Sequence, residues 1–375
     1  MGVAALRSVG VTGACERRAC PERALSKGLS AYGRVMATET EWIPAELESV
    51  ALRLARADQA AFEVAQLSME WSRAGGNGPL TLHQVEDPPG TLGLVVVEVR
   101  PIPPLIPMLF SEAINHLRAA IDNTVFYLVE REQRQLDERL ARRVAMPIFD
   151  DGKKLTDWLA ENDRRGLSAL GASSALARRI RSLQPFASDD VVPSTSERLA
   201  ALMEIEVVNE HPLLLLQAYS NADKHRAIRA AAARVLVQRD DQPFSASDRS
   251  MRPIQPGDVL SMTPVGTGVV VDTNPAVHVE RPAGTAWVSP GHELEYLRNY
   301  VASVAVPTLV TGLAIPRAVP PEMDLGDTGQ TDRERIEEGS WQTAHERWGP
   351  IGMKAFAEAH GAPPAVPPTI RANSN

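Results

Sequence analysis

A long apolar seam in the middle of the chain constrains the fold more than any other feature of the sequence. Between positions 110 and 128, large apolar side chains recur every three or four residues, which is the period of one buried helix face. The seam consists of Phe110, Ile114, Leu117, Ile121, Val125 and Leu128. It predicts a core helix that begins near Ser111 and Glu112 and fades in the charged run after Glu130.

The rest of the chain mixes helical and β patterns. Residues 45–71 carry a second helical stripe, and two β-branched runs at 80–85 and 92–99 flank a turn cluster and predict a β-hairpin. Short β runs separated by Gly, Pro and Asn fill 253–290, and a last core helix follows. The predicted fold class is α+β, with a mainly helical core, a β-hairpin near the N-terminal side and a small β-rich segment near 253–290.

The organisation along the chain follows from where these patterns begin and end. We expect residues 1–35 to be a disordered tail or the product of a start codon assigned too early, because they lack sustained periodicity. The main α+β domain is predicted at 36–313. The Pro-, Gly- and Asp-rich stretch 314–331 predicts a linker, followed by C-terminal helices at 332–361 and a disordered tail at 362–375. These C-terminal helices are a candidate docking element for a partner.

Composition excludes several functional classes. Hydrophobic residues at 44% and charged residues at 23% are typical of a soluble globular protein, and the net charge of -8 argues against a surface devoted to nucleic acid. No apolar run is long enough to span a bilayer, and no secretory signal is present, so we expect a cytoplasmic protein outside the membrane. Cys15 and Cys20 lack partners for a tetrahedral site, and dinucleotide and phosphate loops are absent, so no metal or cofactor is expected.

Polar residues gather on two stretches. On the seam helix, one flank carries His116, Asn123 and Tyr127, and the other carries Asn115, Arg118 and Asp122. The second stretch, QAYSNADKHR at 217–226, contains Asn221, Asp223, Lys224, His225 and Arg226. Two geometries are open for it. A continuous helix places Asn221, Lys224 and His225 on one side, whereas a helix that begins at Ser220 makes Ser220 and Asp223 a capping box worth about 1 kcal/mol.

Four pieces of this sequence, in order, carry a resemblance. They are NHLRAAIDN at 115–123, PIF at 147–149, LQPF at 183–186 and YSNADKHR at 219–226. Together they resemble a group of bacterial proteins, common in actinobacteria and their phages, with motifs like HNLRSALD, PIF, LQPY and LSNxDKHR. The chain departs from that pattern in the Asn115–His116 order and in Phe186. The resemblance, over roughly 92–313, implies a shared fold and shared polar positions, and it implies no activity.

Two functions fit the polar residues. The first is a non-catalytic binding or regulatory module, in which a charged cluster between two helices receives an anionic ligand or only fixes helix register. The candidate cluster is His116, Arg118, Asp122, Asn221, Asp223, Lys224, His225 and Arg226. The partner stays open between an anionic ligand, another protein and a second copy of the chain.

The alternative function is a metal-independent ribonuclease distantly like the helical HEPN proteins, with His225 as base and Lys224 or Arg226 stabilising charge. Those enzymes need a histidine shortly after an arginine. None of the eight histidines has an arginine at the required distance, and LRNY at 297–300 starts such a motif without its histidine. Binding is therefore the preferred hypothesis.

Overall fold

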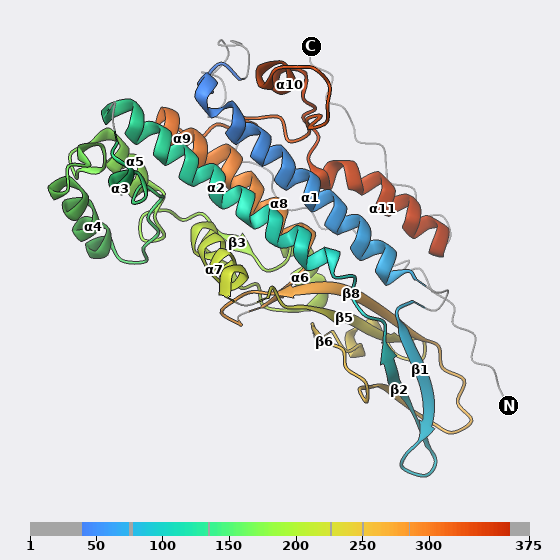
Figure 1. The fold of residues 1–375 in the computed structure, drawn as a ribbon. Helices are drawn as coiled ribbons and strands as arrows, with labels where there is room; N and C mark the ends of the chain where they lie inside the picture. Colours follow the sequence, from blue (N-terminus) through green and yellow to red (C-terminus); the bar gives the residue numbers. More distant parts are fainter. Residues whose placement is uncertain are drawn as a thin grey trace, which may run out of the picture.

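The computed structural model describes residues 40–74, 78–133, 136–225, 227–249, 251–284 and 286–360; side chains at 225, 234–236, 272 and 356–360 are outside this description. The tails expected at 1–35 and 362–375 lie outside the described residues. About 49% of the structure is helix and about 16% is strand, which confirms a mainly helical α+β fold. Figure 1 shows long helices side by side, with twisted strands at one end of them.

Long helices form the core layer. α1 (Glu48–Ser72) packs against α2 (Leu105–Gln133), and α8 (Pro290–Tyr300) contacts both. Every seam residue of α2 is buried, so the predicted core face is confirmed. The helix starts earlier than expected because Pro107 lies in its first turn, where the missing N–H would have had no helical partner.

The last core helix is continuous but changes its pitch. α8 passes through one π-helical turn, Val301–Ala305, into α9 (Val306–Thr311). Pro307, in the first turn of α9, cannot donate a hydrogen bond to the preceding turn, and the wider turn lies directly before it. The N–H of Ile315 then donates to the carbonyl of Ser303 at 2.8 Å, which holds the following segment against this turn.

The predicted hairpin forms the first sheet. β1 (Leu80–Glu86) pairs antiparallel with β2 (Thr91–Val99), and β7 (Val259–Pro264) covers the other edge of β2. A register shift lies between Thr81 and Leu82. One face of this sheet, which includes Val96, closes a small satellite core.

A second sheet gathers the remaining long strands. Its order is β6 (Arg252–Pro253), β5 (Ala230–Arg239), β8 (Val271–Glu280) and β9 (Trp287–Val288). β5 begins at Ala230, shortly after the DKHR stretch. The two β runs expected as separate strands join into β8, and its pairing with β5 shifts register after Arg234.

Short helices fill one side of the molecule, and side-chain caps explain where they begin. α3 (Glu138–Ala141), α4 (Gly152–Arg164), α5 (Ala175–Ser182) and α6 (Glu197–Met203) start after Asp137, Asp151, Ser174 and Ser196. Each of these caps accepts a hydrogen bond from a backbone N–H of the first turn. A two-strand ribbon, β3 (Val192–Pro193) with β4 (Asn209–Glu210), links this region to α7.

α7 (Pro212–His225) runs without a break through the second polar stretch. Of the two geometries left open by the sequence, the continuous helix is confirmed, and a helix start with a capping box at Ser220 and Asp223 is excluded. The helix begins at Pro212 instead, where the Nδ1 atom of His211 accepts a hydrogen bond from the N–H of Leu213 at 3.2 Å. Ser220 lies well inside the helix and is buried.

The C-terminal part packs along α1. The segment expected as a linker, 314–331, buries Ala318, Val319 and Met323, and the indole of Trp42 donates to the carbonyl of Ala318 at 2.9 Å. α10 (Asp332–Glu338) and α11 (Ala344–His360) also contact α1. Within the described ranges, no helix combines the length and the apolarity that a bilayer crossing requires.

Candidate functional site

Arg118 and Asp122 act together as a clamp on the chain that follows α2. The Nε atom of Arg118 donates to Asp122 at 3.0 Å, and its Nη2 atom donates to the carbonyl of Met146 at 2.7 Å. The other oxygen of Asp122 accepts from the N–H of Met146 at 2.9 Å. Both side chains therefore bind the buried backbone that leads into the PIF stretch, and the Nη1 atom of Arg118 has no hydrogen-bond partner among the described residues.

Gln184, shortly after the end of α5, binds the same stretch of backbone as this clamp. The buried side-chain amide of Gln184 accepts from the N–H of Phe149 at 2.9 Å and donates to the carbonyl of Pro147 at 3.0 Å. The LQPF and PIF motifs are therefore joined by hydrogen bonds between side chain and backbone. Three of the four resemblance motifs thus have a structural explanation in one network.

His116 faces α1. Its Nε2 atom lies 3.6 Å from Glu112 Oε1, and burial, together with the positive charges of Arg53 and Arg56, lowers the pKa of His116 although Glu112 opposes this. Among the described side chains, no hydrogen bond or ion pair joins His116 to α7.

The neighbouring residue makes the link between the two helices. Asn115 Nδ2 donates to Asp223 at 2.9 Å, which joins α2 to the last turn of α7. Asn221 and Lys224 are exposed nearby. The side chain of His225 and all of Arg226 lie outside the described residues. Of the expected cluster, Asp223 is thus the residue that joins α7 to α2, through Asn115. Asn115 was not included in the cluster expected from the sequence.

A buried charge network includes Tyr219, one helical turn before Asp223 on α7. Arg281 and Glu293 have no exposed surface, and they form a bidentate pair at 3.0 and 2.9 Å. Tyr219 of α7 donates its hydroxyl to Glu293 at 3.0 Å, and burial raises the pKa of this hydroxyl well above its usual value. Arg281 also donates to the carbonyls of Val192 and Val208. This network ties α7, α8 and the β3–β4 ribbon together, and its polar groups are satisfied.

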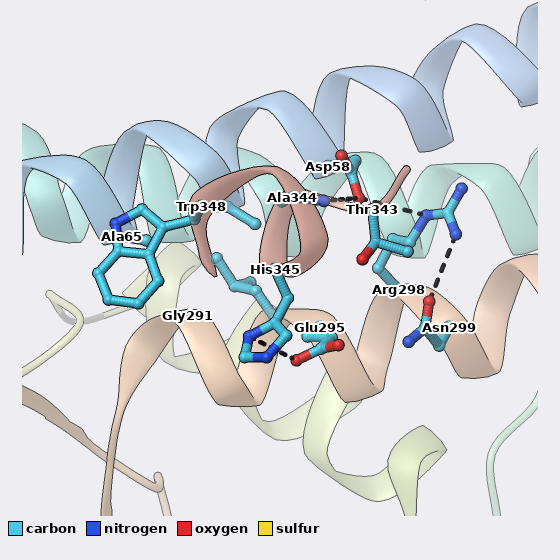
Figure 2. A pocket seen from close by; sticks show the side chains of 12 residues that line it. Asp58, Ala65, Gly291, Glu295, Arg298, Asn299, Thr343, Ala344, His345 and Trp348 are labelled. Atoms are coloured by element: carbon cyan, nitrogen blue, oxygen red, sulfur yellow. Dashed lines mark hydrogen bonds and ion pairs between the residues drawn. The ribbon is translucent and has the colours of Figure 1, made fainter. Parts of the chain in front are cut away.

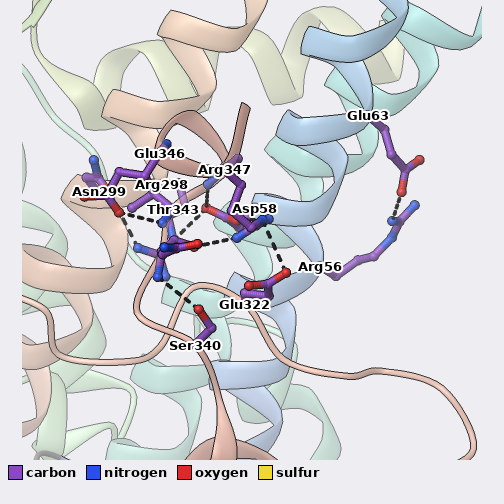
Figure 3. Close-up of polar contacts among 12 residues, drawn as sticks. Arg56, Asp58, Glu63, Arg298, Asn299, Glu322, Ser340, Thr343, Glu346 and Arg347 are labelled. Carbon is purple, nitrogen blue, oxygen red and sulfur yellow. Dashed lines mark hydrogen bonds and ion pairs between the residues drawn. The ribbon is translucent and has the colours of Figure 1, made fainter. Parts of the chain in front are cut away.

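A second buried charge network lies between α1, α8 and α11 (Figure 3). Some of its nitrogen atoms have no hydrogen-bond partner among the described residues. Asp58 Oδ2 lies 2.8 Å from Arg347 Nη2, and Asp58 Oδ1 accepts from the N–H of Ala344 at 3.1 Å. Arg298 is farther away, with Nε 3.9 Å from Asp58 Oδ1. Burial raises the pKa of the Asp58 carboxyl, and the facing guanidinium groups oppose this shift.

Arg298 is the least satisfied buried charge in the described part of the chain. It is 5% exposed, and its Nε and Nη2 atoms have no hydrogen-bond partner among the described residues. Its remaining hydrogen bond runs from Nη1 to Asn299 at 3.3 Å. Burial lowers the pKa of Arg298, since the charged form is poorly solvated there. Most buried polar groups in proteins are hydrogen-bonded, so this guanidinium calls for an explanation.

Two cavities meet at Arg298. The smaller one, about 30 Å³, is lined by Gly291 and Ala65 among others and by the pair His345 and Glu295, whose side chains lie 3.5 Å apart (Figure 2). Burial raises the pKa of Glu295, and the charge of His345 opposes this. This cavity has room for about one or two waters, so it is too small for a substrate.

The larger cavity has a volume of about 380 Å³ and lies between the π-turn, the 314–321 segment and the start of α11. Its lining comprises Arg298, Asn299, Ser303, Val304, Ala314, Pro316, Arg317, Val319, Pro321, Trp341, Thr343 and Glu346. Arg317 stands at φ 53°, a left-handed conformation that non-glycine residues seldom adopt, and its guanidinium lies 3.7 Å from Glu346. Such backbone outliers gather at functional sites.

Sequence reasoning missed this site, although one signal was present. LRNY was noted as an incomplete ribonuclease motif, and its Arg298 and Asn299 both line the larger cavity. Asp58 and Arg347 gave no signal, because they lie on helices whose charged residues are typical of solvated faces.

Among the described residues, no group of three or more His, Cys, Asp or Glu side chains could hold a metal ion. The site is therefore defined by arginines and by apolar walls. Comparison with known proteins adds no relative, since no family model, curated protein or solved structure matches the chain.

Proposed function

We propose that this protein is a non-catalytic binding module whose charged cluster between helices receives an anionic ligand at Arg298, in the larger cavity. This keeps the functional class expected from the sequence and moves the cluster from the DKHR stretch to Arg298. The observation that carries the proposal is a guanidinium that is 5% exposed, lines a cavity of about 380 Å³ and leaves two nitrogens unpaired among the described residues.

The energetics favour an anion at this place. An unpaired buried charge is costly, and a partner 3.9 Å away, itself closer to Arg347, compensates Arg298 poorly. A carboxylate or phosphate oxygen would supply the charge-assisted hydrogen bonds that Arg298 lacks, each worth roughly 1.5–3 kcal/mol net. The volume also lies within the range of about 300–1,000 Å³ that small-molecule sites occupy.

The lining supports binding more than catalysis. The described lining of the larger cavity includes no histidine, lysine or cysteine, which are frequent general bases and nucleophiles. The carboxylate there, Glu346, lies near Arg317. A ligand held by Arg298 and Asn299 would therefore be bound without a histidine, lysine or cysteine beside it to act as a general base or nucleophile.

Titration calorimetry with inorganic phosphate, acetate and benzoate tests this function on the full-length protein. Wild type should bind at least one of these anions, and Arg298→Gln should lose that binding. Ser303→Leu, which fills the cavity and keeps Arg298, should lose it too, and serves if Arg298→Gln fails to fold. Arg249→Gln, which removes an arginine paired with Glu204 elsewhere, is the matched control and should bind like wild type. Binding that survives both cavity substitutions would overturn the proposal.

The alternative function is a ribonuclease distantly like HEPN proteins. It gains one supporting observation, since Arg298 and Asn299 line a common cavity, and it lacks a histidine in that cavity's described lining. Incubation with a labelled RNA pool separates the alternatives: the binding proposal expects no cleavage, whereas cleavage that is lost in His225→Ala would favour the ribonuclease. We also propose a cytoplasmic location, and homo-oligomerisation stays a proposal without a surface assigned to it.

A further inference from the structure

We infer that the ligand of the larger cavity is a small organic monocarboxylate with an apolar body, an inference that rests on the proposed anion-binding function. The cavity is polar at one buried end, apolar along its walls and charged at its mouth. Each of these parts restricts a different property of the ligand.

The exposure of the lining residues orders them by depth. Arg298 and Val319 are buried, at 5% and 3% exposure. Asn299, Ser303, Val304 and Trp341 are half-buried, and Ala314, Pro316, Arg317 and Glu346 are exposed. A ligand whose charged group reaches Arg298 must therefore pass its body along Val304 and Trp341.

The charges of the lining fit a single negative charge. Two arginines, Arg298 and Arg317, stand against one glutamate, Glu346, which leaves one net positive charge in the described lining. Arg317 lies near Glu346 at the mouth, so Arg298 is the cation without a close carboxylate in the cavity. Asp58 approaches Arg298 from the other side but is held more closely by Arg347 and by the N–H of Ala344. A polyphosphate would need further cations that this lining lacks.

The head group follows from the geometry of the guanidinium. A planar carboxylate can accept two parallel N–H bonds from one arginine. Asn299 accepts from Arg298 Nη1 at 3.3 Å and so helps to orient the guanidinium. Because the described lining places a single arginine at the buried end, a carboxylate head matches it better than a phosphate with several equivalent oxygens.

The walls require an apolar body. Val304, Val319, Pro321 and Trp341 present carbon surface to the cavity, and burial of apolar area is favourable. Acetate or inorganic phosphate would leave this surface in contact with water. A ring or branched alkyl group attached to the carboxylate would cover it, and would stack on the Trp341 indole.

Calorimetry with four matched probes tests the inference on the full-length protein. Benzoate carries both features, acetate only the head, benzamide only the body, and inorganic phosphate a different anion. We expect benzoate to bind at least about tenfold more tightly than acetate or phosphate, and benzamide to bind at least about tenfold more weakly than benzoate. Trp341→Ala should weaken benzoate several-fold and leave acetate unchanged, whereas Arg249→Gln, outside the cavity, should leave benzoate affinity unchanged.

The outcomes distinguish the inferred monocarboxylate ligand from the anion-binding function on which that inference rests. If acetate or phosphate binds as tightly as benzoate and Arg298→Gln abolishes that binding, the anion site stands and the apolar body is wrong. If benzamide equals benzoate, the carboxylate is wrong. If no anion binds to wild type at concentrations up to the millimolar range, both the inference and the proposed function are overturned.

Discussion

The carboxylate of Asp58 in α1 lies 2.8 Å from the guanidinium of Arg347 in α11, and only 4% of the Asp58 side chain is exposed. This ion pair fastens the last helix of the described chain to the first one. The same carboxylate lies 3.9 Å from Arg298, so this ion pair is adjacent to the wall of the proposed binding cavity. α11, which also contributes Glu346 to the cavity lining, is therefore part of the proposed site.

Asp58→Asn should destabilise the protein strongly. The substitution removes the buried negative charge near both Arg298 and Arg347, and breaking a buried ion pair by removing one partner costs about 3–5 kcal/mol. Urea unfolding measures this loss. Glu322→Gln, which removes a half-exposed carboxylate 3.4 Å from the same Arg347, should cost less than about 1 kcal/mol. Equal effects of the two substitutions would contradict the assigned role of Asp58.

The network around Glu293 should respond unequally to its two partners. Tyr219→Phe removes one hydrogen bond and leaves Glu293 paired with Arg281, so we expect a cost of about 1–2 kcal/mol. Arg281→Gln leaves a buried carboxylate without its charge partner and should cost about 3–5 kcal/mol. Arg229→Gln, on an exposed arginine, is the control for both. A larger effect of Tyr219→Phe would show that the hydroxyl, and not the arginine, holds Glu293.

Gln184 should protect the backbone of the PIF stretch. Gln184→Met leaves the N–H of Phe149 and the carbonyl of Pro147 without their partners, at about 1–3 kcal/mol for each buried group. Hydrogen exchange at the Phe149 amide should accelerate in this variant. Gln184→Glu keeps the acceptor and loses the donor, so Phe149 should stay protected although stability falls. Unchanged exchange in Gln184→Met would exclude the clamp.

Stability should fall as the pH drops below 6.5, in part because of His278. Burial lowers the pKa of His278 to about 4, so the unfolded chain binds a proton between pH 6.5 and 4 that the folded protein excludes. A gap of about 2.5 pH units corresponds to a loss of up to about 3 kcal/mol, complete near pH 4. His278→Phe should flatten this part of the stability profile measured by urea unfolding, and His83→Gln, at an exposed histidine, should not. The same slope in His278→Phe would assign the effect to other groups.

The elements that the sequence predicted well are those set by local periodicity. The α2 seam, the β1–β2 hairpin and the last core helix each depend on side chains close together in the chain. The start of α2 was predicted too late, and the sequence left open whether a helix begins at Ser220. Local signals for a helix start are common, and tertiary packing decides which of them is used.

The candidate site was harder to predict because its contacts are distant in the chain. His116, Arg118 and Asp122 share one helix, yet His116 lies near the arginines of α1 and the other two bind the backbone of Met146. Arg298 becomes unusual only through its burial, which depends on the packing of α1, α8 and α11. A sequence pattern shows which residues share a helix face, but it does not show what that face will meet.

Diffraction from crystals grown with 4-bromobenzoate tests the central claim most directly, since the anomalous signal of bromine locates the ligand. The account predicts the carboxylate on Arg298 and the bromine along the wall formed by Val304 and Trp341, with no peak in crystals of Arg298→Gln. A cavity that holds only water at saturating ligand, or a bromine peak elsewhere with Arg298 uncontacted, would contradict it.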